Sequence, residues 1–199
     1  QTLGIRDRDG LYTNLGLLLS DQCPHIIKAA VFQGADRTIF RIRSEFSGSL
    51  LKQMRDAFAY IEMHMPVLTK YDGLTRTDTP AVAIEAAREA VLNALIHRDY
   101  STISPTLLSL YSDRIEIVSI GGLPAGISMD TVELGVSVCR NNKLANAFYR
   151  LGYVEAYGTG LMKIADSYKN STVKHKLEVT EQAFKITLPF RPEVMNELK

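Results

Sequence analysis

The chain has 199 residues, with 23 basic and 22 acidic side chains and a formal net charge of +1. This balance gives no sign of nucleic-acid or membrane binding, and the apolar fraction of 46% excludes extensive disorder. No apolar run approaches the ~20 residues that span a bilayer, so we expect no membrane contact. The length is sufficient for one large domain or two small ones.

The two cysteines, Cys23 and Cys139, stand far apart in the chain and have no CxxC spacing. We interpret them as free thiols in a reducing compartment, with a disulfide between them as the alternative. On this interpretation the sequence predicts a cytoplasmic location.

The first part of the chain shows alternating helix and strand signals. Thr13 and Asn14 can cap a short helix, and Ser47-Gly48-Ser49 precedes a longer amphipathic one. The elements expected here are a helix over 16–19, strands over 26–32 and 38–46, and a helix over 50–64. The next residues, 67–79, are polar and irregular apart from an Asp72-Gly73 turn, so we interpret them as a linker.

The rest of the chain is organised around residues 83–99, which read AIEAAREAVLNALIHRD and predict a helix with two unlike faces. Thr79 is its candidate N-cap, with Pro80 near its start. An apolar stripe recurs at steps of three and four: Ile84, Ala87, Val91 and Leu95. A polar line recurs at steps of four: Glu85, Glu89, Asn93 and His97.

After this helix the pattern changes to strands and short helices. Expected are strands over 105–111 and 114–119, helices over 128–134, 143–151 and 161–168, and strands over 174–180 and 183–189. Ser128 is the candidate cap of the first of these helices. Residues from Pro192 onward are expected to form a frayed tail.

Two features of this pattern suit phosphate chemistry. Glu89 and Asn93 lie one helical turn apart, and an Asn oxygen suits Mg²⁺ while a Glu can accept a proton from water. Gly121-Gly122 follows a strand and Gly158-Thr159-Gly160 precedes a helix, where bare N–H groups attract phosphate. Taken alone, each also has a plainer interpretation, a polar helix face or an ordinary glycine turn.

Other motifs carry less weight. His97-Arg98-Asp99 imitates the HRD of protein kinases, but no Asn stands five residues after Asp99. Arg140, Lys143 and Arg150 are best interpreted as a solvated helix face. No GxxxxGK[ST] sequence is present, so these residues contain no helicase motor.

The order of the motifs resembles the ATP-binding domain of the GHKL class, which includes gyrase, MutL and histidine kinases. REAVLNALIHRDYS resembles the N box, and GTGLMKI resembles the GTGLGLxI segment. Together with DRIEIVSIGGLPAGIS and RLGYVEAYGTGL, they strongly resemble the divergent GHKL-like domain of predicted transcriptional regulators. Those proteins are often labelled ATP-dependent DNA helicase RecG-related, and they carry an N-terminal Schlafen-type AlbA domain.

The resemblance implies an α+β protein, a two-layer α/β sandwich of GHKL (Bergerat) type with a smaller N-terminal α/β segment. It implies a connecting segment over 1–75, a GHKL-like domain over 76–190 and a tail over 191–199. Most of an AlbA-like domain would lie before Gln1, and DNA would be bound through domains outside this chain.

The resemblance also implies roles for individual residues. Asn93 would hold Mg²⁺ and the phosphates of ATP, and Glu89 would be the base for hydrolysis. The glycines and Thr159 of Gly158-Thr159-Gly160 would line the triphosphate. Gly121 and Gly122 would pass beneath the adenine or ribose, with Ser119 standing where the class has an Asp that reads the base.

Because Ser119 is neutral, it is a weaker reader of an amino group than a carboxylate. Three functions therefore stay open. The first is a nucleotide-binding regulatory module with at most weak ATPase activity. The second is a nucleotide-blind interaction domain that forms a homodimer. The third is direct DNA binding by residues 143–160, read as a recognition helix and wing.

Overall fold

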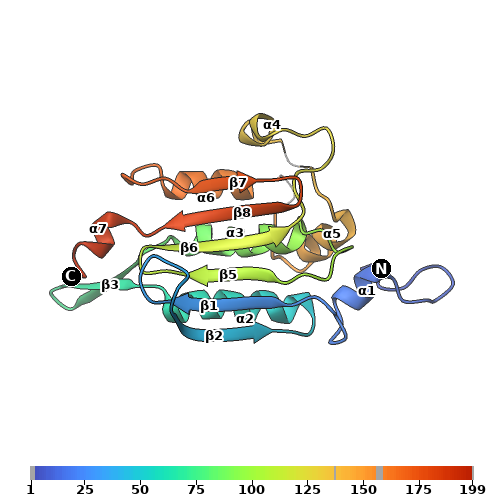
Figure 1. Cartoon of the computed structure of the whole chain (residues 1–199), viewed down its shortest axis with the longest axis horizontal. Coiled ribbons are helices and arrows are strands. Elements are labelled where there is room, and N and C mark those ends of the chain that lie inside the picture. Colours follow the sequence, from blue (N-terminus) through green and yellow to red (C-terminus); the bar gives the residue numbers. More distant parts are fainter. Residues whose placement is uncertain (1–2, 137, 156–158, 199) are drawn as a thin grey trace.

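The computed structural model describes residues 3–136, 138–155 and 159–198, and these form one main sheet with helices behind it (Figure 1). The sheet has six strands in the order β2-β1-β5-β6-β8-β7. The strands are β1 (Ile27–Phe32), β2 (Phe40–Phe46), β5 (Thr106–Leu110), β6 (Arg114–Ile120), β7 (Lys176–Val179) and β8 (Ala183–Pro189). Neighbours are antiparallel except β1 and β5, which pair in parallel.

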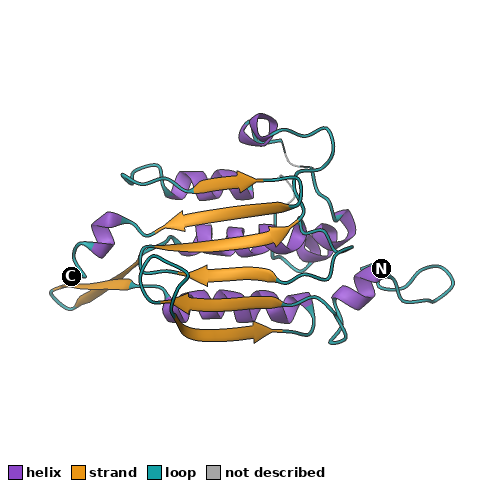
Figure 2. Cartoon of the chain, viewed as in Figure 1, coloured by secondary structure: helices purple, strands orange, loops and turns teal. Residues whose placement is uncertain are grey.

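Three of the helices, over residues 50–64, 84–96 and 160–167, lie on one face of this sheet, behind the strands in Figure 2. The helices are α1 (Asn14–Leu18), α2 (Leu50–His64), α3 (Ile84–Ile96), α4 (Met129–Glu133), α5 (Asn142–Arg150), α6 (Gly160–Ser167) and α7 (Pro192–Met195). The predicted α+β, two-layer sandwich is therefore confirmed. None of these helices has the length and apolarity needed to cross a membrane.

Helix α3 is the centre of the helical layer, with α2 on one side, α6 on the other and the sheet beneath. Its alanines, including Ala86, Ala87 and Ala90, are fully buried and allow this close packing. The predicted division into an apolar and a polar face is too simple. Ile84 of the apolar stripe is 41% exposed, whereas Glu89 of the polar line is only 7% exposed.

Several local signals hold. Thr13 caps α1, Ser49 caps α2 and Ser128 caps α4, each accepting a bond from a backbone N–H of the first turn. The predicted Thr79 cap of α3 is wrong, because the N-cap is Ala83, which makes no side-chain bond. Both cysteines are free, as expected.

The predicted linker over 67–79 is wrong, since these residues form a hairpin of β3 (Val67–Asp72) and β4 (Thr75–Pro80). The Asp72-Gly73 turn joins the two strands, and threonines alternate along β4. Their β-branching favours extended backbone, although the polar composition hides the period of two. Thr79 and Pro80 lie in β4 instead of opening the helix.

Segments in the first and last parts of the chain pack into the same fold. Because β1 pairs with β5, the segment before residue 76 contributes β1 and β2 to the sheet that the later segment completes. The prediction of a frayed tail is wrong as far as residue 195, because Val194 of α7 is 1% exposed. The Arg191 N–H also donates to the Ala81 carbonyl at 2.9 Å.

Candidate functional site

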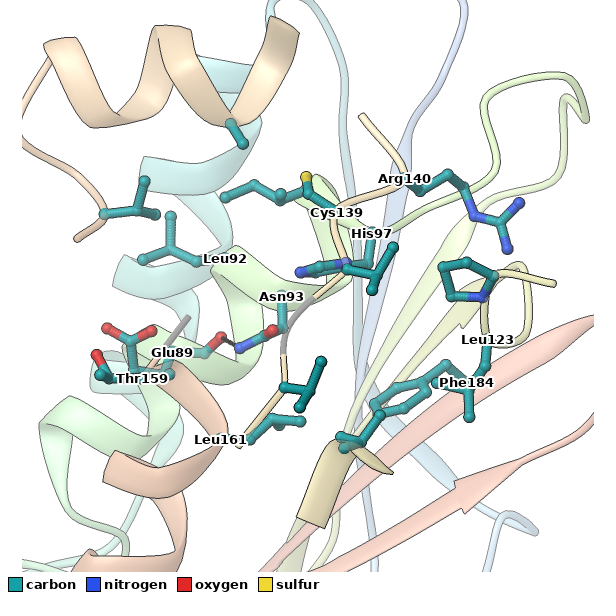
Figure 3. Close-up of a pocket in the computed structure, with 18 of the residues that line it drawn as sticks. Glu89, Leu92, Asn93, His97, Leu123, Cys139, Arg140, Thr159, Leu161 and Phe184 are labelled. Carbon is teal, nitrogen blue, oxygen red and sulfur yellow. Dashed lines mark hydrogen bonds between the residues drawn. The ribbon is translucent and has the colours of Figure 1, made fainter. Parts of the chain in front are cut away.

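A cavity of about 210 Å³ lies between α3, α6, the turn after β6 and the segment 123–140 (Figure 3). It brings together seven of the eight residues that the sequence analysis singled out: Glu89, Asn93, Ser119, Gly121, Gly122, Thr159 and Gly160. The eighth, Gly158, lies outside the described residues. Much of the remaining wall is apolar: Leu92, Leu123, Pro124, Val136, Leu161 and Phe184.

One end of the cavity is polar, and its closest approach is between Gly160 and α3. Gly160 is the first residue of α6, and a Cβ placed on it would lie 2.6 Å from Glu89 Oε2 and 3.1 Å from Asn93 Nδ2. Only a residue without a side chain fits there without moving the carboxylate. The glycine therefore lets the start of α6 pack closely against the polar line of α3.

Asn93 is held in one orientation. Its Nδ2 donates to the Glu89 carbonyl oxygen at 2.8 Å, one turn back along α3. Because the amide oxygen and nitrogen point in different directions, this bond turns Oδ1 away from the Glu89 carbonyl, in a residue that lines the cavity. The side chain therefore presents an acceptor, which is the kind of atom that Mg²⁺ binds.

Glu89 is a buried carboxylate that is paired with a cation. Its Oε1 accepts a bond from Arg88 Nη1 at 2.6 Å, and Arg88 in turn donates to the Tyr153 carbonyl. Burial raises the pKa of the Glu89 carboxyl above its usual range, while the charges of Arg88 and Lys163 lower it in part. A raised pKa favours a group that takes up a proton near neutral pH.

A cation stands at the same end. Lys163 Nζ lies 2.6 Å from Glu155 Oε1 and 3.6 Å from Glu85 Oε1. Thr159 also donates to Glu155, at 3.2 Å. Since Glu155 is exposed, its bonds to Lys163 and Thr159 can exchange for bonds to an anion in the cavity.

Gly121 and Gly122 form the floor of the cavity, and their lack of side chains is required by close packing. A Cβ on Gly122 would lie 2.2 Å from the Thr180 carbonyl oxygen, and Gly121 has φ of +106°. The Gly121 N–H donates to the Gln182 carbonyl at 2.8 Å. The glycines thus let the end of β6 approach the turn between β7 and β8.

Ser119 lies in β6 opposite Phe184 of β8 and is 3% exposed. Both residues line the cavity, and Figure 3 places Phe184 with Leu123 at the end away from Glu89. This end is therefore largely apolar. An aromatic ring or base can pack there, with the Ser119 hydroxyl as a neutral polar contact.

The end of α3 is anchored by side chains that sequence reasoning treated as secondary. The Arg98 guanidinium is buried and donates to Thr106 Oγ1 at 2.8 Å and to the Ser104 carbonyl. Asn141 Nδ2 donates to the carbonyls of Ile96 and Arg98, two groups left over at the helix end. These bonds fix the position of His97, which lines the cavity.

Arg140 joins the loop after the cavity to the glycine turn. Its Nη2 donates to the Gly122 carbonyl at 2.8 Å, and its Nη1 lies 3.8 Å from Asp99 Oδ2. Burial lowers the pKa of His97, and the nearby Arg140 charge lowers it further. Arg140 therefore belongs to the cavity wall, which corrects its prediction as part of a solvated helix face.

Sequence reasoning missed Lys163, Glu155 and the apolar wall. Lys163 stands in the GTGLMK segment. Its closeness in sequence to the glycines was the signal that could have identified it as a site residue. The described residues contain no group of three or more His, Cys, Asp and Glu side chains placed to hold a metal ion. Magnesium at this site would depend on Asn93 Oδ1 and on oxygens of a bound phosphate.

Comparison with known proteins agrees with this picture. Residues 104–188 match the family described as "Putative ATP-dependent DNA helicase recG C-terminal", a span of less than half the chain. The matched span includes Ser119 and both glycine turns, and it supports an HATPase-like domain. It begins after α3, so Glu89 and Asn93 lie outside it.

The fold also occurs in a solved structure. The DIP2311 protein from Corynebacterium diphtheriae is similar with a TM-score of 0.82 and 24% sequence identity, over 95% of this chain and 39% of that one. At this identity the likeness shows the fold alone. The chain thus spans well under half the length of that protein. No curated protein matches the sequence significantly.

Proposed function

We propose that the cavity binds ATP with Mg²⁺ and that this chain is the nucleotide-binding module of a larger transcriptional regulator. The observation that carries the proposal is the close approach of Gly160 to Glu89 and Asn93 in the wall of one cavity. This polar end adjoins an apolar end, and the cavity lies in a domain whose later part matches an HATPase-like family. Contact with DNA would come from domains outside this chain.

The residues present fit a phosphate chain with its metal at the polar end. Asn93 Oδ1 supplies a neutral oxygen ligand, and the first turn of α6 supplies N–H groups and the positive end of a helix dipole. Lys163 supplies a positive charge once it exchanges its bond to Glu155. Gly158 belongs to the same turn in the sequence, outside the described residues.

The base would lie against Phe184 and Leu123, above Gly121-Gly122. The nearest polar group there is Ser119, which cannot offer the charge-assisted bond that a carboxylate makes to an amino group. We therefore expect modest affinity and weak preference for adenine.

We expect Glu89 to serve as the base for an attacking water. Its carboxylate lies against Gly160 in the cavity wall, and burial raises its pKa. When magnesium is bound, it neutralises phosphate charge. The role of the Glu89 side chain would be to orient a water and accept its proton. Slow ATPase activity is the form of turnover that we propose.

The alternative of direct DNA binding by 143–160 finds less support. Within the described residues 142–155 there is a helix and a turn, with no strand that would form a wing. The helix buries Leu144, Ala147 and Phe148 against the core. Arg140 just before it is bonded to Gly122 and Asp99.

Calorimetric titration with Mg-ATP tests the proposal. We expect saturable heat for the wild type, and an affinity lower by at least about tenfold for Asn93→Ala, since that change removes the oxygen ligand. Asn146→Ala is the matched control, because Asn146 is exposed on α5 and does not line the cavity.

No heat from the wild type at millimolar Mg-ATP would contradict the proposal. It would favour the nucleotide-blind interaction domain instead. An equal effect of Asn93→Ala and Asn146→Ala would show that nucleotide binds outside this cavity.

A further inference from the structure

The two edges of the main sheet differ in how they are protected. The β7 edge has only four residues, and its Glu178 is paired with Lys176 and Lys185. The β2 edge has seven residues, and Figure 1 shows it as the last strand of the sheet, with no described element beyond it. A long unprotected edge offers a row of free backbone groups to another strand.

The β2 edge and the residue before it also expose apolar side chains. Ile39, Phe40 and Ile42 are 54%, 44% and 43% exposed. Native edges are commonly guarded by lysine, proline or a bulge that turns the strand away. The pairing with β1 has one irregularity, at Arg41 of β2, which is an extra residue between Phe40 and Ile42, so the stretch 42–46 stays regular.

Register with β1 tells which face each β2 side chain occupies. Ile42, Ser44 and Phe46 stand opposite Val31, Ala29 and Ile27, on the helix side of the sheet. Arg43 and Glu45 stand opposite Ala30 and Lys28, on the side without helices. Glu45 makes only a long ion pair with Lys28, at 3.9 Å with both side chains 55% exposed.

We propose that β2 pairs antiparallel with β2 of a second copy of this chain, about a two-fold axis at Ser44. A two-fold axis perpendicular to the sheet keeps both helical layers on one side. Because opposed residues must share a face, this axis must pass through a residue and not between two.

Charge then selects among the residues of the strand. An axis at Arg41, Arg43 or Glu45 sets that residue against its own copy, with like charges opposed. An axis at Ile42 sets Arg41 of one copy opposite Arg43 of the other, again with like charges opposed. Like charges directly opposite one another destabilise a strand pair.

The axis at Ser44 avoids these conflicts. It sets Arg43 opposite Glu45 twice and Ile42 opposite Phe46 twice, with two small serines at the centre. Opposite charges and aromatic–branched pairs each stabilise a strand pair by roughly 0.2–1 kcal/mol. The edge is therefore complementary to itself, which points to a second copy as the occupant.

Five paired residues on each strand cover less surface than the ~1,600 Å² of a standard interface. We therefore expect a reversible dimer that is populated at high micromolar protein concentration. This dimer is independent of nucleotide, because β2 lies across the sheet from the cavity.

Sedimentation velocity over a concentration series tests the interface. Arg43→Glu and Glu45→Arg should each weaken association about tenfold or more, because each change sets like charges together at two places. The combined Arg43→Glu/Glu45→Arg variant should restore association. Arg41→Glu is the matched control, since Arg41 is an arginine of the same strand but lies outside the span 42–46.

Cysteine cross-linking gives a second readout that does not depend on charge. Opposed Cα atoms in an antiparallel pair lie ~4.5–5.5 Å apart, within the range of a disulfide. Ser44→Cys should therefore form a covalent dimer at least about tenfold faster than Ile42→Cys. In this register Ile42 lies about 14 Å from its own copy along the strand. The wild type controls for Cys23 and Cys139.

Three results would overturn the proposal. They are a wild type that stays monomeric at every concentration, a combined charge swap that fails to recover association, and equal cross-linking rates at positions 44 and 42.

Discussion

Replacing Gly122 with alanine is expected to lower the free energy of unfolding by about 3 kcal/mol, the upper end of the usual cost of overpacking. The new Cβ would lie 2.2 Å from the Thr180 carbonyl oxygen and 2.8 Å from that of Glu181. Both are backbone atoms, so relief requires β6 and the β7–β8 turn to separate. That movement strains the bond from Gly121 to Gln182. Urea denaturation followed by circular dichroism measures the loss.

Gly126→Ala is the control for this prediction. Gly126 has φ of +81° and no heavy atom within 4 Å of a built Cβ, so only backbone strain opposes the substitution. That strain costs about 1 kcal/mol. If Gly122→Ala is no more destabilising than Gly126→Ala, then the close approach of Gly122 to the β7–β8 turn is wrong.

Replacing Gly160 with alanine is expected to lower the affinity for Mg-ATP about 100-fold while leaving the fold intact. Alanine favours helix, so the start of α6 should not be weakened. The Cβ would, however, clash with Glu89 Oε2 and crowd Asn93 Nδ2, and so displace the side chains proposed to meet the phosphates. A 100-fold loss corresponds to about 2.7 kcal/mol of binding free energy, measured by calorimetric titration.

Gly73→Ala controls for the loss of a glycine far from the cavity, at the tip of the β3–β4 hairpin. Nothing lies within 4 Å of a built Cβ there. Nucleotide affinity should match the wild type. Unchanged affinity in Gly160→Ala would remove Gly160 from the proposed phosphate site.

Much of the fold could be predicted because local signals were strong and agreed with one another. Thr13, Ser49 and Ser128 each precede an apolar period and do cap the helices that follow. The strands over residues 26–32 and 183–189 combine branched side chains with flanking turns, and both occur in the structure.

Predictions failed where polar composition or tertiary packing outweighed local pattern. The threonine-rich hairpin of β3 and β4 has the period of a strand but not its apolar residues. Helix α3 is enclosed by α2, α6 and the sheet, so its polar line includes the buried Glu89. Helix α7 is short, and the burial of Val194 depends on contacts distant in sequence.

The residues of the candidate site also divide into those that the sequence could predict and those that it could not. Glu89, Asn93 and Gly160 could be selected because their chemistry shows in residue type and spacing. Phe184 and Leu123 carry no such mark, since an apolar residue that lines a cavity looks like one that fills a core. Only the approach of β8 and of the segment 123–140 reveals them.

A crystal structure of this chain with magnesium and a non-hydrolysable ATP analogue tests the central claim most directly. The proposal predicts phosphates at Gly160 and Asn93, with the metal on Asn93 Oδ1 and the base between Phe184 and Leu123. Electron density for the analogue outside this cavity, or a cavity without analogue at saturating concentration, would contradict it.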